Sequence, residues 1–319
     1  MKTNDTCIIA DDFDSEGEII LGKNVVIERN VVFRGGMIII GDNCLIREGV
    51  YIHVTKSFEL GHDSHLGYKW NIEGREITIG HHLFCVDGFR IGEGMIGGGS
   101  ATDVMSKLTI GNYCHLGLQT LINTAREVSI GNNVGFGFRS CIFTHGAWQN
   151  VLEGYSAKFA PVKILDNVWI PSNVTILPGV IIGEGSTIGS GSVIIHDVAP
   201  HTFVGGNPAK VIKDSHEWPR VLSYGQKYKI VKEIIELWQT FIADQYPINI
   251  KYYTTRISIL EENAHADLIE MSFDETFDQP EADVIFYLTS YTKKQQNPSL
   301  IANHLENFLR RRGIKFMEN

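Results

Sequence analysis

The sequence lacks several features that would assign a protein to a class at once. Its five cysteines are spread out and include no Cys-x-x-Cys pair, a usage typical of a reducing compartment. No apolar run approaches the ~18–20 residues of a membrane span, and the N-terminus shows no signal-peptide pattern. We therefore expect a cytoplasmic protein without a transmembrane segment.

Positive charge is also scarce. The formal net charge is −9, and no basic run stands out before Arg310, Arg311 and Arg312. This balance argues against nucleic acid as a partner. We expect the three arginines to cap the negative end of an apolar C-terminal helix.

What the sequence does contain is a six-residue repeat of aliphatic residues. A period of six fits neither an α-helix nor a hairpin meander, but it fits a solenoid with three flat faces and 18-residue coils. Neighbouring coils would pair as parallel strands ~4.8 Å apart. Glycine, asparagine and aspartate cluster where the corners would fall. The predicted inward triplets are Leu21/Ile27/Phe33, Ile40/Ile46/Ile52, Leu60/Leu66/Ile72, Ile79/Cys85/Ile91, Ile110/Leu116/Ile122, Ile130/Phe136/Ile142, Ile164/Ile170/Ile176 and Ile182/Ile188/Ile194.

Two long insertions, 93–107 and 144–161, interrupt the repeat. Counting the coils predicts that both leave after a third strand, two coils apart, so that their roots lie ~10 Å from one another. Segment 123–128 of the intervening coil would reach the same edge. Loops at one edge of a rigid scaffold commonly form binding and catalytic sites, and His145 stands at the root of the second insertion.

The phrase "VKILDNVWIPSNVTILPGVIIGEGSTIGSGSVIIHDVAPHTFVGGNPAKVIK", residues 162–213, resembles the C-terminal coils of hexapeptide-repeat acyltransferases. That group contains the maltose, galactoside and capsular-sugar O-acetyltransferases, and the resemblance covers about 18–213. It implies a left-handed parallel β-helix that is usually trimeric and uses acetyl-CoA. The hand comes from the resemblance alone, because ordinary parallel crossovers are right-handed. We thus predict a mainly β fold, with about eight triangular coils in 1–213 and a small α+β module in 214–319.

In the resembled family a histidine at this corner is the general base, which makes His145 the candidate catalytic residue. The implied reaction moves an acetyl group from acetyl-CoA to a hydroxyl, or an amine, of a sugar or polysaccharide precursor. Imidazole suits this task because it titrates near ~6.5 and can both accept and return a proton. The alternative is a loop histidine bonded only to backbone.

The acceptor side departs from the family. Ala147 stands where many members have a second histidine, and Gly117 and Ala125 stand where the galactoside and maltose enzymes place an asparagine and an aspartate. Stacking of Trp148 on a sugar competes with the reading that it pins its loop to the scaffold. The candidate acceptor-binding residues are Asn123, Arg126, Trp148, Glu153 and Tyr155.

The donor side follows the family more closely, although Leu165 and Pro171 replace usual glycines. By resemblance, small residues at the corners contact the pantetheine arm, and lysines near "GNPAK" contact phosphate. The bland alternative is that these residues only fill corners or lie solvated on the surface. The candidates are Ser172, Ser190 and Gly191 for the arm, Gly206 and Asn207 for the end turn, and Lys210 and Lys213 for phosphate.

Two other functions stay open. A γ-carbonic-anhydrase-like zinc site would need three histidines between subunits, and His62, the His81–His82 pair and His115 are available. That family's two histidines five residues apart are missing, so we expect no metal. The second alternative is a non-catalytic scaffold or interaction protein.

The C-terminal third loses the repeat. Helical spacing of apolar residues predicts a helix over 230–242, strand-like runs follow at 249–260, 267–273 and 283–291, and Pro298 opens a second helix. A module of this size can have its own core. It would cap the solenoid, add oligomer contacts or serve another role.

Overall fold

The computed structural model describes residues 1–85, 94–98, 102–261, 267–297 and 299–316, and it divides into Met1–Arg220 and Val221–Asn319. The first unit extends seven residues, 214–220, past the predicted boundary. Trp218 holds this extension on the β-helix. Its Nε1 donates to Thr187 Oγ1 at 3.1 Å, and its ring lies 5.4 Å from that of Phe203.

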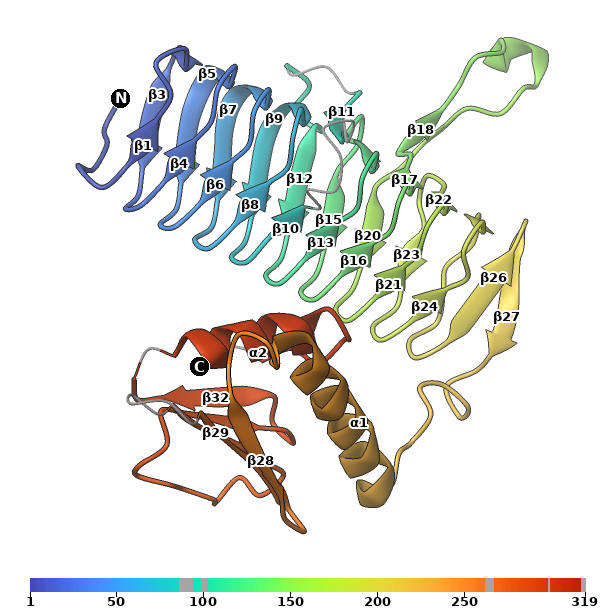
Figure 1. Cartoon of the computed structure of the whole chain (residues 1–319). Helices are drawn as coiled ribbons and strands as arrows, with labels where there is room; N and C mark the ends of the chain where they lie inside the picture. Colours follow the sequence, from blue (N-terminus) through green and yellow to red (C-terminus); the bar gives the residue numbers. More distant parts are fainter. Residues whose placement is uncertain (86–93, 99–101, 262–266, 298, 317–319) are drawn as a thin grey trace. The chain divides into compact units, whose positions relative to one another are not determined.

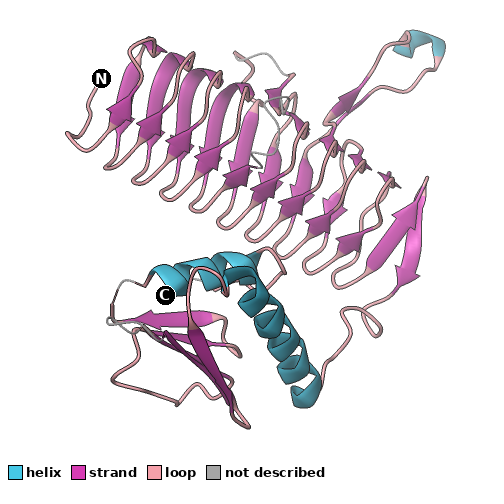
Figure 2. Cartoon of the chain, in the orientation of Figure 1, coloured by secondary structure: helices cyan, strands magenta, loops and turns pink. Residues whose placement is uncertain are grey.

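The first unit is a parallel β-helix with three faces (Figures 1 and 2). The second face of each coil joins one parallel sheet, which β27 (Ala209–Lys213) ends by pairing antiparallel with β26. The strands of this sheet are β1 (Ile8–Ile9), β4 (Val26–Ile27), β6 (Leu45–Ile46), β8 (His65–Leu66), β10 (Phe84–Cys85), β13 (His115–Leu116), β16 (Gly135–Phe136), β21 (Trp169–Ile170), β24 (Thr187–Ile188) and β26 (Phe203–Gly206).

The third face of one coil and the first face of the next are continuous near the N-terminus. There β5 (Val32–Ile40), β7 (Tyr51–Leu60) and β9 (Asn71–Ile79) each run around a corner, with a register shift where they turn. Elsewhere the two faces have separate strands. These are β3 (Glu18–Leu21), β12 (Lys107–Ile110), β15 (Val128–Ile130), β20 (Val162–Ile164) and β23 (Ile181–Ile182) on the first face, and β2 (Asp14–Ser15), β11 (Met95–Gly97), β14 (Leu121–Asn123), β17 (Cys141–Ile142), β22 (Thr175–Ile176) and β25 (Val193–Ile194) on the third.

The predicted inward residues form the core, because every one that the structure describes is at most 3% exposed. Ile91 lies outside the described residues, and its expected place in the ladder is taken by Ile96, which pairs with Ile72 and Ile122. The first excursion therefore has a part before β11 and a part after it. Our prediction that all extra residues follow the third strand was wrong for this coil, since a forward count of six cannot detect an insertion at the preceding corner.

The ladder also begins earlier than the resemblance suggested. Lys2 bridges to Ile20, β1 pairs with β4, and β2 pairs with β5, so residues before 18 form a partial coil. At the other end Val198 bridges to Ile182 before β26. About eight full coils thus lie between two partial ones, as predicted for the body of the solenoid.

The corners between first and second faces explain the enrichment in asparagine. The corners before β4, β6, β8, β10, β13, β16 and β21 each place one residue at a φ of +53° to +60°, a left-handed conformation that asparagine tolerates better than most side chains. Side chains at this position also bond along the solenoid axis, as Asn24 does to Asn43 at 2.9 Å. The residues concerned are Asn24, Asn43, Asp63, His82, Tyr113, Asn133 and Asn167.

The second unit is an α+β module with its own core. Helix α1 (Tyr224–Ile242) begins earlier than predicted because Ser223 and Gln226 form a capping box. The predicted strand 249–260 is in fact a hairpin of β28 (Ile248–Tyr252) and β29 (Arg256–Glu261), and the sheet continues through β30 (Leu268–Ser272), β31 (Val284–Tyr287) and β32 (Thr292–Gln295).

The second helix, α2 (Leu300–Arg310), is capped by Ser299, and Pro298 lies outside the described residues. Arg312 donates to the Phe308 carbonyl in its last turn at 3.2 Å, which confirms a helix-capping role within the arginine run. Among the described residues, neither this helix nor any other is long and apolar enough to cross a membrane.

Candidate active site

His145 begins a two-stranded arm that leaves the solenoid immediately after the third face. The arm pairs β18 (His145–Gly146) antiparallel with β19 (Lys158–Phe159), and Figure 1 shows it extending away from the stacked coils. His145 stands opposite Phe159 in this pairing, and their rings stack with centroids 5.4 Å apart at 20°. The half-buried imidazole is therefore held at the root of the arm and not at its tip.

Asn123, at the end of β14 one coil earlier, fixes which nitrogen of this imidazole carries a proton. Its Oδ1 lies 3.0 Å from His145 Nδ1, and it also accepts from the backbone N–H groups of Ala125 at 3.3 Å and Thr144 at 3.4 Å. Because a backbone N–H can only donate, the Asn123 side-chain atom that both N–H groups face is the amide oxygen and not the amide nitrogen. Nδ1 must then donate, which leaves the lone pair of His145 on Nε2.

Two further residues hold the Asn123 amide in place. Thr144 is fully buried, and its hydroxyl lies 2.7 Å from Asn123 Oδ1 while accepting from the Arg126 N–H at 3.0 Å. Gly98 approaches from the first excursion at φ +85°, and a Cβ there would lie 2.3 Å from Asn123 Nδ2. The asparagine is 6% exposed, so its amide is oriented by packing as well as by hydrogen bonds.

Both excursions and the intervening coil meet at this edge, as the coil count predicts. The Arg126 guanidinium lies 3.6 Å from an Asp103 carboxylate oxygen of the first excursion and 4.9 Å from the centroid of the Phe159 ring in the second. Its Nη1 also donates to the Ala125 carbonyl at 2.6 Å. Arg126 and His145 therefore belong to one corner, because both pack against the Phe159 ring.

The predicted acceptor residues separate into two groups. Asn123 and Arg126 lie with His145, although Asn123 is buried against the histidine and acts as its positioning partner. Glu153 belongs to the short 3-10 helix Val151–Glu153 in the distal part of the arm, and Tyr155 follows it, 47% exposed. Trp148 is 98% exposed, so it does not pin the arm to the scaffold.

The predicted donor residues line up along a different corner. Ser172, Ser190 and Gly206 each stand two residues after the inward residue of a second-face strand, in three successive coils. This donor corner lies between the second and third faces, whereas His145 lies beyond the third face. Within one chain the donor residues and His145 are therefore about 20 Å apart, at opposite edges of the third face. Asn207, Lys210 and Gly191 are exposed there, and Lys213 Nζ lies 5.5 Å from the centroid of the Trp218 ring.

Sequence reasoning missed Thr144, Phe159 and Asp103. The first could have been found, because Thr124 and Thr144 both follow an inward isoleucine by two residues and so share a corner. The other two depend on how the excursions fold back, which leaves no periodic signal. His115, considered for zinc, lies in β13 with its ring 5.8 Å from Phe84, away from the corner of His62 and His82.

Comparison with known proteins supports the repeat. Residues 161–196 match the bacterial transferase hexapeptide model (six repeats), and residues 37–67 match the hexapeptide repeat of succinyl-transferase. These matches confirm the resemblance over the matched residues, which lie within the parallel β-helix. The coils they cover are similar to those of the hexapeptide-repeat transferases.

Individual relatives share the coils only in part. Chloramphenicol acetyltransferase of Klebsiella aerogenes is 33% identical over 35% of this chain and 53% of its own. A 2,3,4,5-tetrahydropyridine-2,6-dicarboxylate N-acetyltransferase of Limosilactobacillus reuteri is 55% identical over 20% of this chain and 26% of its own. A Vibrio cholerae hexapeptide-repeat acetyltransferase, solved with acetyl-CoA, is 25% identical over 49% of this chain and 70% of its own, with a TM-score of 0.35. The chain spans about half the length of the curated relatives it matches.

Proposed function

We propose that the protein is an acetyl-CoA-dependent acyltransferase in which His145 acts as general base. The single observation that carries the proposal is the hydrogen bond from His145 Nδ1 to Asn123 Oδ1 at 3.0 Å. It leaves the lone pair on Nε2, on the side of the ring free to meet a substrate proton. The names of the relatives reported above, which are acetyltransferases, support the same reaction class.

The reaction needs no acyl-enzyme. Nε2 accepts the proton of the acceptor hydroxyl as its oxygen attacks the thioester carbonyl. The C–S bond then breaks, and the imidazolium returns the proton to the CoA thiolate. During this cycle the charged ring donates from Nδ1 to Asn123, and a hydrogen bond from a charged donor is stronger than one from a neutral donor.

The acceptor in this proposal is a sugar or polysaccharide precursor, with a hydroxyl or an amine as the attacking group. Arg126, whose guanidinium lies 3.6 Å from Asp103, and His145 both pack against the ring of Phe159, a residue that is 47% exposed. A sugar ring with an anionic substituent matches this pair, because aromatic faces pack on sugar C–H groups and guanidinium binds carboxylates. Trp148, Glu153 and Tyr155 would contact the acceptor only through the distal arm.

The proposal includes a homotrimer because a single chain does not bring its general base close to its own acetyl-CoA-binding corner. His145 and the donor corner at Ser172 and Ser190 lie at opposite edges of the third face. A second copy packed against that face would bring its own donor corner to the first copy's His145. A cytoplasmic location fits the five cysteines, none of which is paired in a disulfide.

Calorimetric titration of acetyl-CoA and CoA into the full chain tests the donor half of the proposal. We expect micromolar binding at one site per chain. Release of CoA thiol with a panel of sugars then tests the reaction, and His145→Ala should lower turnover by about 10²–10⁴. His196→Ala, an exposed histidine elsewhere on the coils, is the matched control. Absence of acetyl-CoA binding by the folded trimer, or full turnover in His145→Ala, would refute the assignment.

A further inference from the structure

One corner of the solenoid departs from the asparagine pattern in two adjacent coils. The two corner positions hold His62 and Asp63 in one coil and His81 and His82 in the next; Asp63 and His81 are exposed, whereas His62 and His82 are half-buried. In the flanking coils the same two positions hold Asp42 and Asn43 before this block, and Asn112 and Tyr113 after it. A cluster of three imidazoles and a carboxylate thus replaces groups that elsewhere only bond along the axis.

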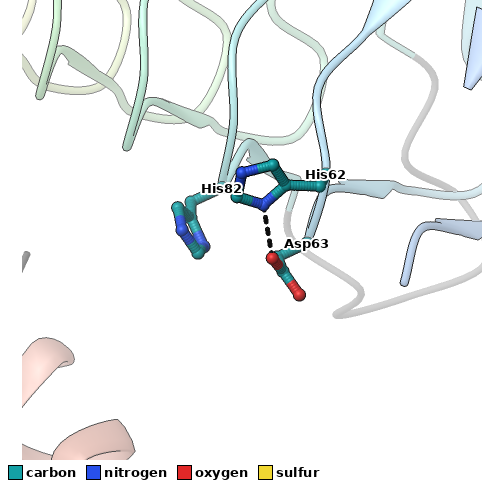
Figure 3. A group of neighbouring side chains, drawn as sticks. All are labelled: His62, Asp63 and His82. Carbon is teal, nitrogen blue, oxygen red and sulfur yellow. Dashed lines mark hydrogen bonds and ion pairs between the residues drawn. The ribbon is translucent and has the colours of Figure 1, made fainter. Parts of the chain in front are cut away.

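Three of these side chains converge. Figure 3 shows His62 between Asp63 and His82, and one ligand atom from each lies within 4.8 Å of the others. His62 Nδ1 is 2.5 Å from Asp63 Oδ2, and the His62 and His82 rings meet edge to face with centroids 5.4 Å apart. Zinc bonds of about 2.0–2.2 Å place ligand atoms some 3–4 Å apart, so small side-chain movements close the set around one ion.

Ring stacking positions the two candidate histidine ligands. His81 stacks on His62 with centroids 3.7 Å apart, and its Nδ1 accepts the His62 backbone N–H at 3.1 Å. Tyr113 stacks on His82 with centroids 4.5 Å apart at 15°. The backbone is fixed as well, because the His82 N–H donates to the His62 carbonyl at 3.0 Å. Both candidate ligand rings are therefore restricted before any ion arrives.

The carboxylate is oriented in the same way. Asp63 Oδ1 accepts from Asn43 Nδ2 at 3.0 Å, which turns Oδ2 toward His62. The His62 and Asp63 side chains are 39% and 37% exposed, so an ion can reach them from solvent.

We propose that this corner binds one divalent transition-metal ion of the zinc, cobalt and nickel group. The ligands are one ring nitrogen each from His62 and His82 and a carboxylate oxygen from Asp63. Two imidazoles with one carboxylate suit these ions, whereas calcium and magnesium prefer oxygen alone. Water completes the coordination. The ion ties two neighbouring coils together, within one chain and apart from His145, so its role is to stabilise the solenoid.

The test uses the full chain, treated with a chelator and then titrated with Zn²⁺ and with Co²⁺. We expect one ion per chain by calorimetry, a Co²⁺ visible spectrum typical of nitrogen and oxygen ligands, and a higher melting temperature with Zn²⁺. His62→Asn, Asp63→Asn and His82→Asn should each weaken Zn²⁺ binding at least about tenfold. All three should fold, because neighbouring coils place asparagine at these positions and asparagine tolerates the positive φ of residues 63 and 82.

His216→Ala removes an exposed histidine outside the cluster and should bind Zn²⁺ like the wild type. Failure of the wild type to bind stoichiometric Zn²⁺ or Co²⁺ would overturn the proposal. Retention of wild-type affinity by a folded His62→Asn/His82→Asn double variant would do the same. Neither result bears on acetyl-CoA affinity, which depends on another part of the β-helix.

Discussion

Replacing Asn123 by alanine should slow the reaction while leaving the base in place. The substitution removes the acceptor of the His145 Nδ1 proton. A neutral hydrogen bond is worth about 1 kcal/mol and one from a charged donor about 1.5–3 kcal/mol. The difference, about 0.5–2 kcal/mol, is the extra support that Asn123 gives to the imidazolium in the transition state. This corresponds to a loss of kcat of about 2-fold to 30-fold, which freedom of the ring and of its tautomer would increase to as much as about a hundredfold.

Asn123→Asp is the informative partner variant. A carboxylate keeps the acceptor, and its negative charge favours the imidazolium over the neutral ring. The acidic limb of the kcat/KM profile should therefore move to higher pH in Asn123→Asp, a shift that Asn123→Ala cannot produce. A residue with a merely structural role would change stability in both variants without moving this limb.

The assay is release of CoA thiol across a pH series, combined with ¹H–¹⁵N correlation of the imidazole. In the wild type we expect the neutral ring to carry its proton on Nδ1. Because Asn123→Ala leaves the Thr144 N–H without its acceptor, about 1–3 kcal/mol of stability can be lost, and melting curves must accompany the kinetics. Thr144→Val is the matched fold control, since it removes another contact to the same oxygen. A proton found on Nε2, or full activity in a folded Asn123→Ala, would refute the reasoning.

Two further predictions concern other parts of the chain. Replacing Lys210 and Lys213 by alanine should raise the Kd of acetyl-CoA about tenfold with little change in kcat. The reason is that two exposed cations near the end turn would no longer contact phosphate. An unchanged Kd would contradict the assignment of these lysines to phosphate binding. In the second unit, burial raises the pKa of Glu270, which is 3% exposed and whose Oε2 lacks a hydrogen-bond partner among the described residues. A raised folded-state pKa means that stability is greatest below the unfolded pKa and is lost as pH rises through the folded one. Glu270→Gln should thus raise the free energy of unfolding by about 1 kcal/mol at pH 7 and remove this pH dependence, which denaturant titrations at pH 4 and pH 7 would check.

The β-helix could be predicted from the periodicity of the sequence. An inward isoleucine every six residues has one function, to stack on its counterpart in the next coil, so its position is set locally and recurs. Ile96 shows where counting in sixes fails. An insertion before its strand shifted the predicted inward residue to Ile91, although Ile96 pairs in register with the neighbouring coils. The same holds for 249–260, where one apolar run proved to be two strands because the turn within it has no strong glycine or proline signal.

The sequence by itself determined the solenoid, its approximate coil number, the edge from which the second excursion leaves and His145 as the residue to examine there. These follow from local periodicity and from motif spacing. Only the tertiary structure decided that Asn123 supports the imidazole, that Arg126 lies between Asp103 and Phe159, and that His62, Asp63 and His82 converge. Except for the adjacent pair His62 and Asp63, such contacts join residues about 20 or more apart along the chain. Their distances depend on how the coils stack and how the loops fold back, and the repeat in the sequence contains no information about either.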